Sequence, residues 1–269
     1  MPKLLVRPEA PDQNGRILQI TPESAGWKYI GFEVYQLKPG QKLEQATEDQ
    51  EVCLVLVSGR ATVSTGDQVW ENIGERMDVF EKIPPYAVYI PNDSSYVVEA
   101  TTELELAVCK APGHGNHKAR LIEPDPEKKC STRGQGSNTR FIQDILPDWD
   151  ESADSLLVVE VYTPAGNWSS YPPHKHSIDD IPNESLLEET YYHRINPSQG
   201  FSFQRVYTDD RSLDETMSVE NRNVVMVPEG YHPVGAPHGY DVYYLNVMAG
   251  PKRVWKFHND PAHEWMLKK

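Results

Sequence analysis

The sequence predicts an all-β protein built from two small β-barrels in tandem. Short runs of β-branched and aromatic residues recur along the 269-residue chain and are bounded by Gly, Pro, Asn or Asp, as is typical of strands. The 22 prolines and 17 glycines supply the turns that many short strands need. A helical period appears only weakly, in residues 178–189 and in the last ten residues. These three observations favour a sandwich or barrel architecture.

Seven segments carry the strand signal most clearly. In chain order they are 52–57, 60–64, 87–90, 96–99, 104–108, 156–162 and 242–247. Five lie in the first half of the chain and two in the second. We expect each to form one strand of a barrel.

The order of the elements repeats, which divides the chain into two related halves. One strand-rich block spans 15–112 and a second spans 139–258, joined by the polar stretch 113–138. We therefore expect an N-terminal barrel with its linker over 1–138 and a C-terminal barrel over 139–269. The first block contains no histidine, so the second barrel is expected to carry any metal site.

Composition narrows the class of function. A net charge of −14 argues against a nucleic-acid partner, and no apolar run approaches the roughly 20 residues of a membrane span. The N-terminus lacks a secretory signal, so we expect a cytoplasmic protein that acts on a small molecule. Cys53, Cys109 and Cys130 form no CxxC pair, which argues against a disulfide framework or a thiolate metal site. Strand edges and faces leave a homo-oligomer open.

Residues 171–176 carry the clearest chemical signal. His174 and His176 stand one residue apart in a strand-like stretch, so both imidazoles can face one metal ion. His232 follows a Pro/Gly turn at the start of a later strand. Three imidazoles and one carboxylate suit Zn, Mn, Fe or Ni and leave positions open for a substrate. The pattern predicts a catalytic metal site.

The carboxylate ligand must be chosen among several acids between His176 and the next strand. They are Asp179, Asp180, Glu184, Glu188 and Glu189. Glu189 is favoured because a strand-like run follows it directly, whereas 177–187 is a polar excursion. Glu188 would point to the opposite face of that strand. Glu188, Asp180 and Asp179 stay as alternatives.

The order of these residues resembles the two metal-binding motifs of the cupins. The matching positions are Gly166, His174-x-His176, a later Glu, Gly200 and Pro228-x-Gly230-x-His232. Twelve residues separate His176 from Glu189, where cupins usually have only a few. The resemblance implies a bicupin, two jelly-roll-like barrels in tandem.

Nearly the whole chain is similar to the 5-deoxy-glucuronate isomerase family of inositol catabolism, related to 4-deoxy-L-threo-5-hexosulose-uronate ketol-isomerase. The similarity rests on the duplicated barrel and on the runs 172–176, 188–207 and 228–234. It implies isomerisation of 5-deoxy-D-glucuronate, an aldose, to 2-deoxy-5-keto-D-gluconate, with a divalent cofactor, Zn or Mn. The ligands that it implies are His174, His176, Glu189 and His232.

Such an isomerisation moves hydrogen between adjacent carbons and needs a general base with a pKa near the working pH. The candidates are Glu189, Tyr191, His193 and His238. Strand parity places Tyr191 and His193 on the face of Glu189.

The carboxylate of the substrate needs a cation, preferably a guanidinium. Arg194 and Arg205 lie near the expected ligands and are the leading candidates, with Arg140 and Lys175 behind them. Two other functions stay open: another metal-dependent cupin enzyme, such as a dioxygenase or decarboxylase, and a sugar-acid-binding bicupin without turnover. Dependence on oxygen or the absence of product would identify them.

Overall fold

A computed structural model describes residues 3–267. The chain divides into two compact units, each made of discontinuous segments. Unit 1 holds the chain up to Arg7, Cys130–Gln143 and the chain from Val159 on, and unit 2 holds Pro8–Lys129 and Asp144–Val158. The boundary expected after residue 138 falls inside a segment of unit 1, so the assignment of 1–138 and 139–269 as domains stays a prediction.

Helices are few and short, as expected of an all-β chain. They are α1 (Pro22–Ala25), α2 (Pro126–Lys129) and the 3-10 turns η1 (Val79–Glu81), η2 (Gly136–Asn138) and η3 (Glu264–Leu267). Within the described residues, no helix has the length and apolar character needed to cross a membrane.

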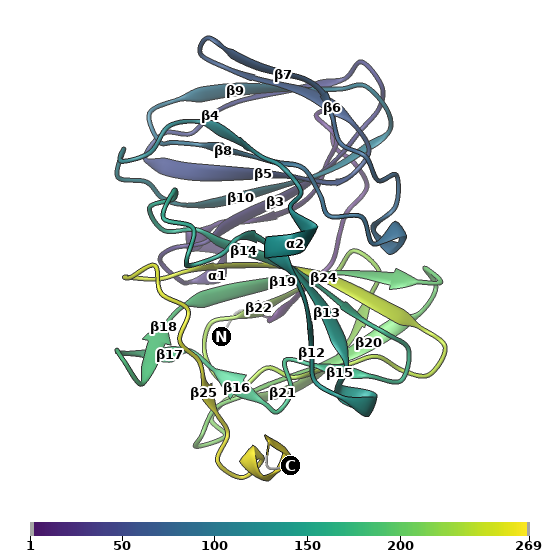
Figure 1. Cartoon of the computed structure of the whole chain (residues 1–269), viewed down its shortest axis with the longest axis vertical. Helices are drawn as coiled ribbons and strands as arrows, with labels where there is room; N and C mark the ends of the chain where they lie inside the picture. Colours follow the sequence, from purple (N-terminus) through teal and green to yellow (C-terminus); the bar gives the residue numbers. More distant parts are fainter. Residues whose placement is uncertain (1–2, 268–269) are drawn as a thin grey trace. The chain divides into compact units, whose positions relative to one another are not determined.

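Unit 1 has two main sheets (Figure 1). The larger has the order β1 (Leu5–Val6), β22 (Val224–Val227), β19 (Glu188–Asn196), β24 (Asp241–Ala249), β14 (Leu157–Thr163), β13 (Arg140–Leu146), β12 (Cys130–Arg133). The smaller has the order β15 (Trp168–Ser169), β23 (Val234–Gly235), β20 (Phe201–Tyr207), β21 (Asp214–Glu220). Two short ladders pair β16 (His174–Lys175) with β25 (His258–Asn259), and β17 (Ser177–Asp180) with β18 (Glu184–Leu186).

The apolar core of unit 1 draws on both main sheets. Tyr191 and Tyr244 come from neighbouring strands of the larger sheet, and Val206, Val219 and Val234 come from the smaller one. Alternate residues of β19 therefore point toward the interior between the sheets, as in a sandwich. Because Glu189 lies two residues before Tyr191, it faces the same interior.

Unit 2 repeats this design. Its larger sheet has the order β11 (Arg120–Ile122), β8 (Ala87–Ile90), β5 (Gln50–Ser58), β10 (Leu104–Pro112), β3 (Gly31–Leu37), β2 (Arg16–Ile20). Its smaller sheet has the order β4 (Lys42–Ala46), β9 (Ser95–Ala100), β6 (Ala61–Thr65), β7 (Gln68–Ile73). A second apolar core contains residues of both sheets.

The repeat gives a physical reason to look for the metal in unit 1. The strand order β8-β5-β10-β3 matches β22-β19-β24-β14. Val52 pairs with Ile90 in β8, and Glu189 pairs with Val227 in β22, so Val52 occupies the place of Glu189. Val52 is a buried member of the apolar core, where a carboxylate would lose its hydration. Unit 2 has an apolar side chain at this position.

The seven strands expected from the sequence are confirmed, and one helical expectation is wrong. Residues 178–189 form the β17–β18 hairpin and the start of β19. Pro182 stands in the hairpin turn and Asn183 N–H donates to the Asp180 carbonyl, closing the turn at 2.8 Å. A proline lacks the N–H that a helix interior needs. At the C-terminus only the single turn η3 forms within the described residues.

The closed barrels expected from the sequence are not confirmed. The strands of each unit fall into separate sheets, and no sheet of the described chain closes on itself. The all-β fold class stands.

Candidate metal centre and its cavity

Three side chains from separate segments of unit 1 meet at one point. His176 lies between β16 and β17, Glu189 is the second residue of β19, and His232 lies between β22 and β23. One ligand atom of each lies within 4.8 Å of the others. All three are buried, with at most 2% of each residue exposed. Antiparallel pairing of β19 with β22 holds the carboxylate and the His232 segment at the same end of the sheet.

Backbone carbonyls orient both histidine rings. His176 Nδ1 lies 2.9 Å from the Leu187 carbonyl and His232 Nδ1 lies 2.8 Å from the Gly230 carbonyl. When Nδ1 donates to these carbonyls, each ring presents Nε2 to the cluster, the arrangement that metal-binding histidines use. The two Nε2 atoms lie 3.0 Å and 3.3 Å from Glu189 Oε2.

The electrostatics of the cluster suit a cation. Burial lowers the pKa of His232 to about 3, which keeps this ring neutral at neutral pH. Burial acts in the same direction on His176, but the bonded Glu189 carboxylate outweighs it and raises the pKa of that ring. Within the described residues, His232 Nε2 is buried without a hydrogen-bond partner. A buried lone pair beside a carboxylate fits a divalent metal ion.

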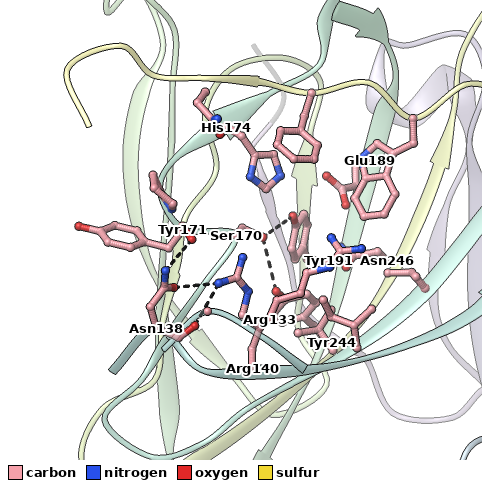
Figure 2. A pocket seen from close by; sticks show the side chains of 18 of the residues that line it. Arg133, Asn138, Arg140, Ser170, Tyr171, His174, Glu189, Tyr191, Tyr244 and Asn246 are labelled. Atoms are coloured by element: carbon pink, nitrogen blue, oxygen red, sulfur yellow. Dashed lines mark hydrogen bonds between the residues drawn. The ribbon is translucent and has the colours of Figure 1, made fainter. Parts of the chain in front are cut away.

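His174 borders this cluster from β16. Its ring centroid lies 4.9 Å from that of His232 and 6.5 Å from that of His176. The imidazole points into the cavity (Figure 2). Burial, with the positive charges of His176 and Arg140, lowers its pKa to about 3. His174 is therefore a neutral imidazole and can act as a further ligand.

The exposed aspartates of the β17–β18 hairpin lie away from the histidines. Asp179 forms an ion pair with Lys252 at 2.9 Å. Asp180 accepts a hydrogen bond from the Asn183 amide at 3.1 Å. The structure thus places Glu189, and neither aspartate, beside the histidine rings.

The remaining two carboxylates are buried but are also separate from the cluster. Glu184 accepts from the Ser177 N–H and lies 3.9 Å from the Lys175 ammonium. Glu188 precedes Glu189 in β19, so it points to the opposite face of the sheet. Lys175 itself pairs with Asp209 and does not line the cavity.

A cavity of about 300 Å³ opens onto Glu189 and His174. It is bounded by residues of β12, β13, β14, β19, β24 and the C-terminal segment, and all of the residues that line it belong to unit 1. Phe257 of that segment packs against the His174 ring with centroids 4.8 Å apart. The cavity is large enough for a small sugar acid.

Hydroxyl groups line the middle of the cavity. Ser170 Oγ lies 3.0 Å from the Tyr191 hydroxyl and 3.4 Å from the Tyr244 hydroxyl (Figure 2). Burial raises the pKa of both phenols, and the Glu189 charge adds to the effect on Tyr191. Ser170 has a backbone φ of 49°, in the left-handed region that favours glycine. The side chain at this strained position is the one that contacts both phenols.

Two arginines line another side of the cavity. Arg140 Nη1 donates to the Asn138 carbonyl at 3.0 Å and to its side-chain oxygen at 3.1 Å. Arg133 lies with its Cζ 5.8 Å from the Trp255 ring centroid. Burial lowers the pKa of Arg140. Its guanidinium still remains charged at neutral pH.

Two of the candidate bases lie away from the cavity lining. His193 is fully buried, with Nε2 3.0 Å from Gln204 Oε1 and Nδ1 3.3 Å from Ser202 Oγ. Burial lowers its pKa to about 4. His238 is exposed in the turn before β24. Parity correctly placed Tyr191 on the face of Glu189, and both line the cavity.

The two leading arginine candidates also lie outside the lining. Arg205 is half-buried and forms a two-point pair with Asp214, with both distances 2.7 Å. Arg194 is buried, and its Nε donates to the Asn221 side chain. The structure instead brings Arg133 and Arg140 to the cavity. Arg194 and Arg205 do not line this cavity, and their assignment to the substrate carboxylate stays a prediction.

Sequence reasoning did not single out Arg133, Ser170 or Asn246. Asn246 could have been found from the sequence, because it is the one side-chain amide in the apolar run of β24. In the structure it pairs with Tyr191. Ser170 adjoins the Tyr-Pro-Pro-His motif, but its left-handed backbone is not readable from residue type. Arg133 belongs to a stretch that looked like a linker.

Comparison with known proteins agrees with this architecture. The family model described as KduI/IolB matches residues 4–266. The chain belongs to the KduI/IolB family. Curated relatives include 5-deoxy-glucuronate isomerases of Geobacillus kaustophilus, 60% identical over 99% of this chain and 96% of the relative, and of Bacillus subtilis strain 168, 52% identical over the full length of both.

Solved structures place the KduI/IolB chain among cupin-related folds. An IolB-like protein of Salmonella typhimurium LT2 superposes with a TM-score of 0.94 at 52% identity, covering 99% of this chain and 100% of that one. Oxalate decarboxylase of Lactobacillus farciminis superposes with a TM-score of 0.67 at 12% identity, covering 96% and 89%. At that identity the second likeness speaks for the fold alone.

Proposed function

We propose that this protein is a 5-deoxy-glucuronate isomerase, which converts the aldose 5-deoxy-D-glucuronate to the ketose 2-deoxy-5-keto-D-gluconate in inositol catabolism. Sequence identity of 52% to 61% with isomerases of that name, over essentially the whole chain, is the observation that carries the proposal. The cavity adds support, because it presents a charged, hydroxyl-lined space of a size that suits a six-carbon sugar acid.

The proposal includes a divalent metal, Zn or Mn, held by His174, His176, Glu189 and His232. The donor set of imidazole nitrogen and carboxylate oxygen suits both ions. When bound, such an ion acts as a Lewis acid that offsets the negative charge of an enediolate. The buried Nε2 of His232 supports this assignment, because it lies 3.3 Å from Glu189 Oε2 and has no hydrogen-bond partner among the described residues.

Different side chains around the cavity carry out the proton transfers to oxygen and between the two carbons. Tyr191 keeps its proton, since burial holds its pKa well above neutral pH, so it donates to a substrate oxygen. Ser170 Oγ orients that phenol from 3.0 Å. Of the cavity-lining candidates, Glu189 is the one with a basic oxygen, and we assign to it the removal of the C2 proton and its return at C1. His193 and His238 have no part in this scheme.

A proton NMR time course with 5-deoxy-D-glucuronate tests the proposal. Metal-loaded protein should convert the aldose to the keto acid, and in deuterated solvent the product should carry deuterium at the carbon that was C1 of the substrate. Chelated protein and His174→Ala should both turn over far more slowly. Arg211→Gln, a change at an exposed residue stacked on Tyr207, is the matched control and should behave as wild type.

Other outcomes would assign a different chemistry. Oxygen uptake would indicate an oxidative enzyme. Release of carbon dioxide, with the carbon skeleton of the substrate changed, would indicate a decarboxylating enzyme. Ligand-dependent melting without any product would indicate a binding protein. Either result would contradict the isomerase assignment.

A further inference from the structure

We infer that Arg140, assisted by Arg133, forms the anion-binding end of the cavity and receives the carboxylate of the substrate. The inference rests on the proposed function for the identity of the ligand. It assigns an orientation as well: the carboxylate lies at the arginines and the reacting carbonyl lies at His174 and Glu189.

The first observation is that neither guanidinium has an acidic partner. The chain has 40 acidic residues and a net charge of −14, so its arginines have many carboxylates available. Within residues 3–267, no ion pair involves Arg133 or Arg140, whereas Arg205 and Arg120 pair with Asp214 and Asp150. Arg133 is exposed, so water can solvate its charge. Arg140 is half-buried, and a half-buried cation without a counter-ion is unfavourable unless a ligand supplies the charge.

The second observation is the way in which Arg140 is held. Both of its hydrogen bonds in the described structure leave from Nη1 and end on Asn138. Asn138 in turn donates through its amide to the Tyr171 carbonyl at 3.0 Å, which fixes it in place. The Nε and Nη2 groups therefore stay available as a donor pair for a carboxylate. Figure 2 shows the Arg140 guanidinium inside the cavity.

The third observation concerns the layout of the cavity. In Figure 2 the His174 ring and the Arg140 guanidinium extend into the same space, with Ser170 between them. Both arginines line the same cavity as His174 and Glu189. A sugar acid that binds between the arginines and His174 meets charged guanidinium donors at one end and an imidazole at the other.

The middle of the cavity holds a donor suited to the sugar hydroxyls. Asn246 is 3% exposed and lines the cavity from β24. Within the described residues its Nδ2 is buried without a hydrogen-bond partner. An amide donor left unsatisfied in a cavity costs free energy that a ligand oxygen recovers on binding. The cavity thus offers polar groups along its length and not only at its ends.

The test compares two aldoses that differ in one group. One is 5-deoxy-D-glucuronate and the other is the neutral 5-deoxy-D-glucose, in which a hydroxymethyl group replaces the carboxylate. Wild type should prefer the acid by about 10²-fold in kcat/KM, as expected for charge-assisted hydrogen bonds. Arg140→Gln should reduce this preference to less than about tenfold, mainly through KM, and Arg140→Lys should recover part of it.

Two further variants separate Arg140 from general effects of charge. Arg211→Gln removes one positive charge from the surface and should keep the wild-type preference. Arg205→Gln removes the guanidinium paired with Asp214 and should also keep it. Loss of the preference in Arg205→Gln and its retention in Arg140→Gln would overturn the inference.

Calorimetric binding of the same two compounds separates this inference from the proposed function. If wild type turns over neither compound, the isomerase proposal fails. The binding affinities of the acid and the neutral compound then still test the anion site. Tighter binding of the acid in wild type, lost in Arg140→Gln with an unchanged melting temperature, supports the site. Equal binding of acid and neutral compound by wild type would overturn it.

Discussion

Ser170 offers a substitution in which stability and activity should move in different directions. Its φ of 49° lies in the left-handed region, which costs a residue with a Cβ about 1 kcal/mol relative to glycine. Its hydroxyl lies 3.0 Å from the Tyr191 hydroxyl, and removing one partner of a buried hydrogen bond costs about 1–3 kcal/mol. Ser170→Ala loses the hydroxyl and keeps the strain, whereas Ser170→Gly loses the hydroxyl and relieves the strain.

We therefore expect Ser170→Gly to be more stable than Ser170→Ala by about 1 kcal/mol, or about 2–4 °C in Tm. Both variants should lose roughly 10- to 100-fold in kcat, because Tyr191 is no longer oriented. Thermal denaturation and NMR turnover of the two variants measure these quantities. Equal stability of the two would refute the strain argument, and a wild-type kcat in Ser170→Gly would refute the role of the hydroxyl.

Three more predictions concern the metal, a buried histidine and the C-terminal segment. Excess Zn at about 100 times its Kd should stabilise the chelated wild type by about 2.7 kcal/mol, and His232→Ala should lose this shift in calorimetry. Burial lowers the pKa of His193 from 6.5 to about 4, so only the unfolded chain takes up this proton in that interval. Wild type should lose stability as the pH falls from 6.5 to 4, by an amount on the order of 3 kcal/mol more than His193→Gln, and urea unfolding measures the difference. Phe257→Ala uncovers the His174 ring and should raise KM without a matching fall in kcat; an unchanged KM would contradict a covering role.

Strand periodicity was a reliable guide to the sheets because it depends on local residue type. Residues 242–247, for example, form the middle of β24 as expected. Parity along β19 also placed Glu189 and Tyr191 on one face. The helix predicted for residues 178–189 was wrong. These residues form a hairpin, because Pro182 and a tight turn outweigh a weak amphipathic pattern.

Long-range pairing explains what the sequence could not supply. The stretch 113–138 looked like a connector, yet its strand β12 pairs with β13. In this pairing Cys130 lies opposite Gln143 and Arg133 lies opposite Arg140, which brings Arg133 and Arg140 to the cavity. Arg194 and Arg205 were favoured by nearness in sequence to the ligands, but nearness along a strand does not set which face a side chain takes. The C-terminal segment reaches the cavity because β25 pairs with β16, a contact between residues far apart in the chain.

A metal titration of chelated protein tests the central claim most directly. Zn or Mn is added in steps, bound metal is measured by elemental analysis after gel filtration, and conversion of 5-deoxy-D-glucuronate is followed by NMR in the same samples. The account predicts one tightly bound ion per chain, with turnover that rises in proportion and levels off at one equivalent. Full turnover by protein shown to contain no metal would contradict it.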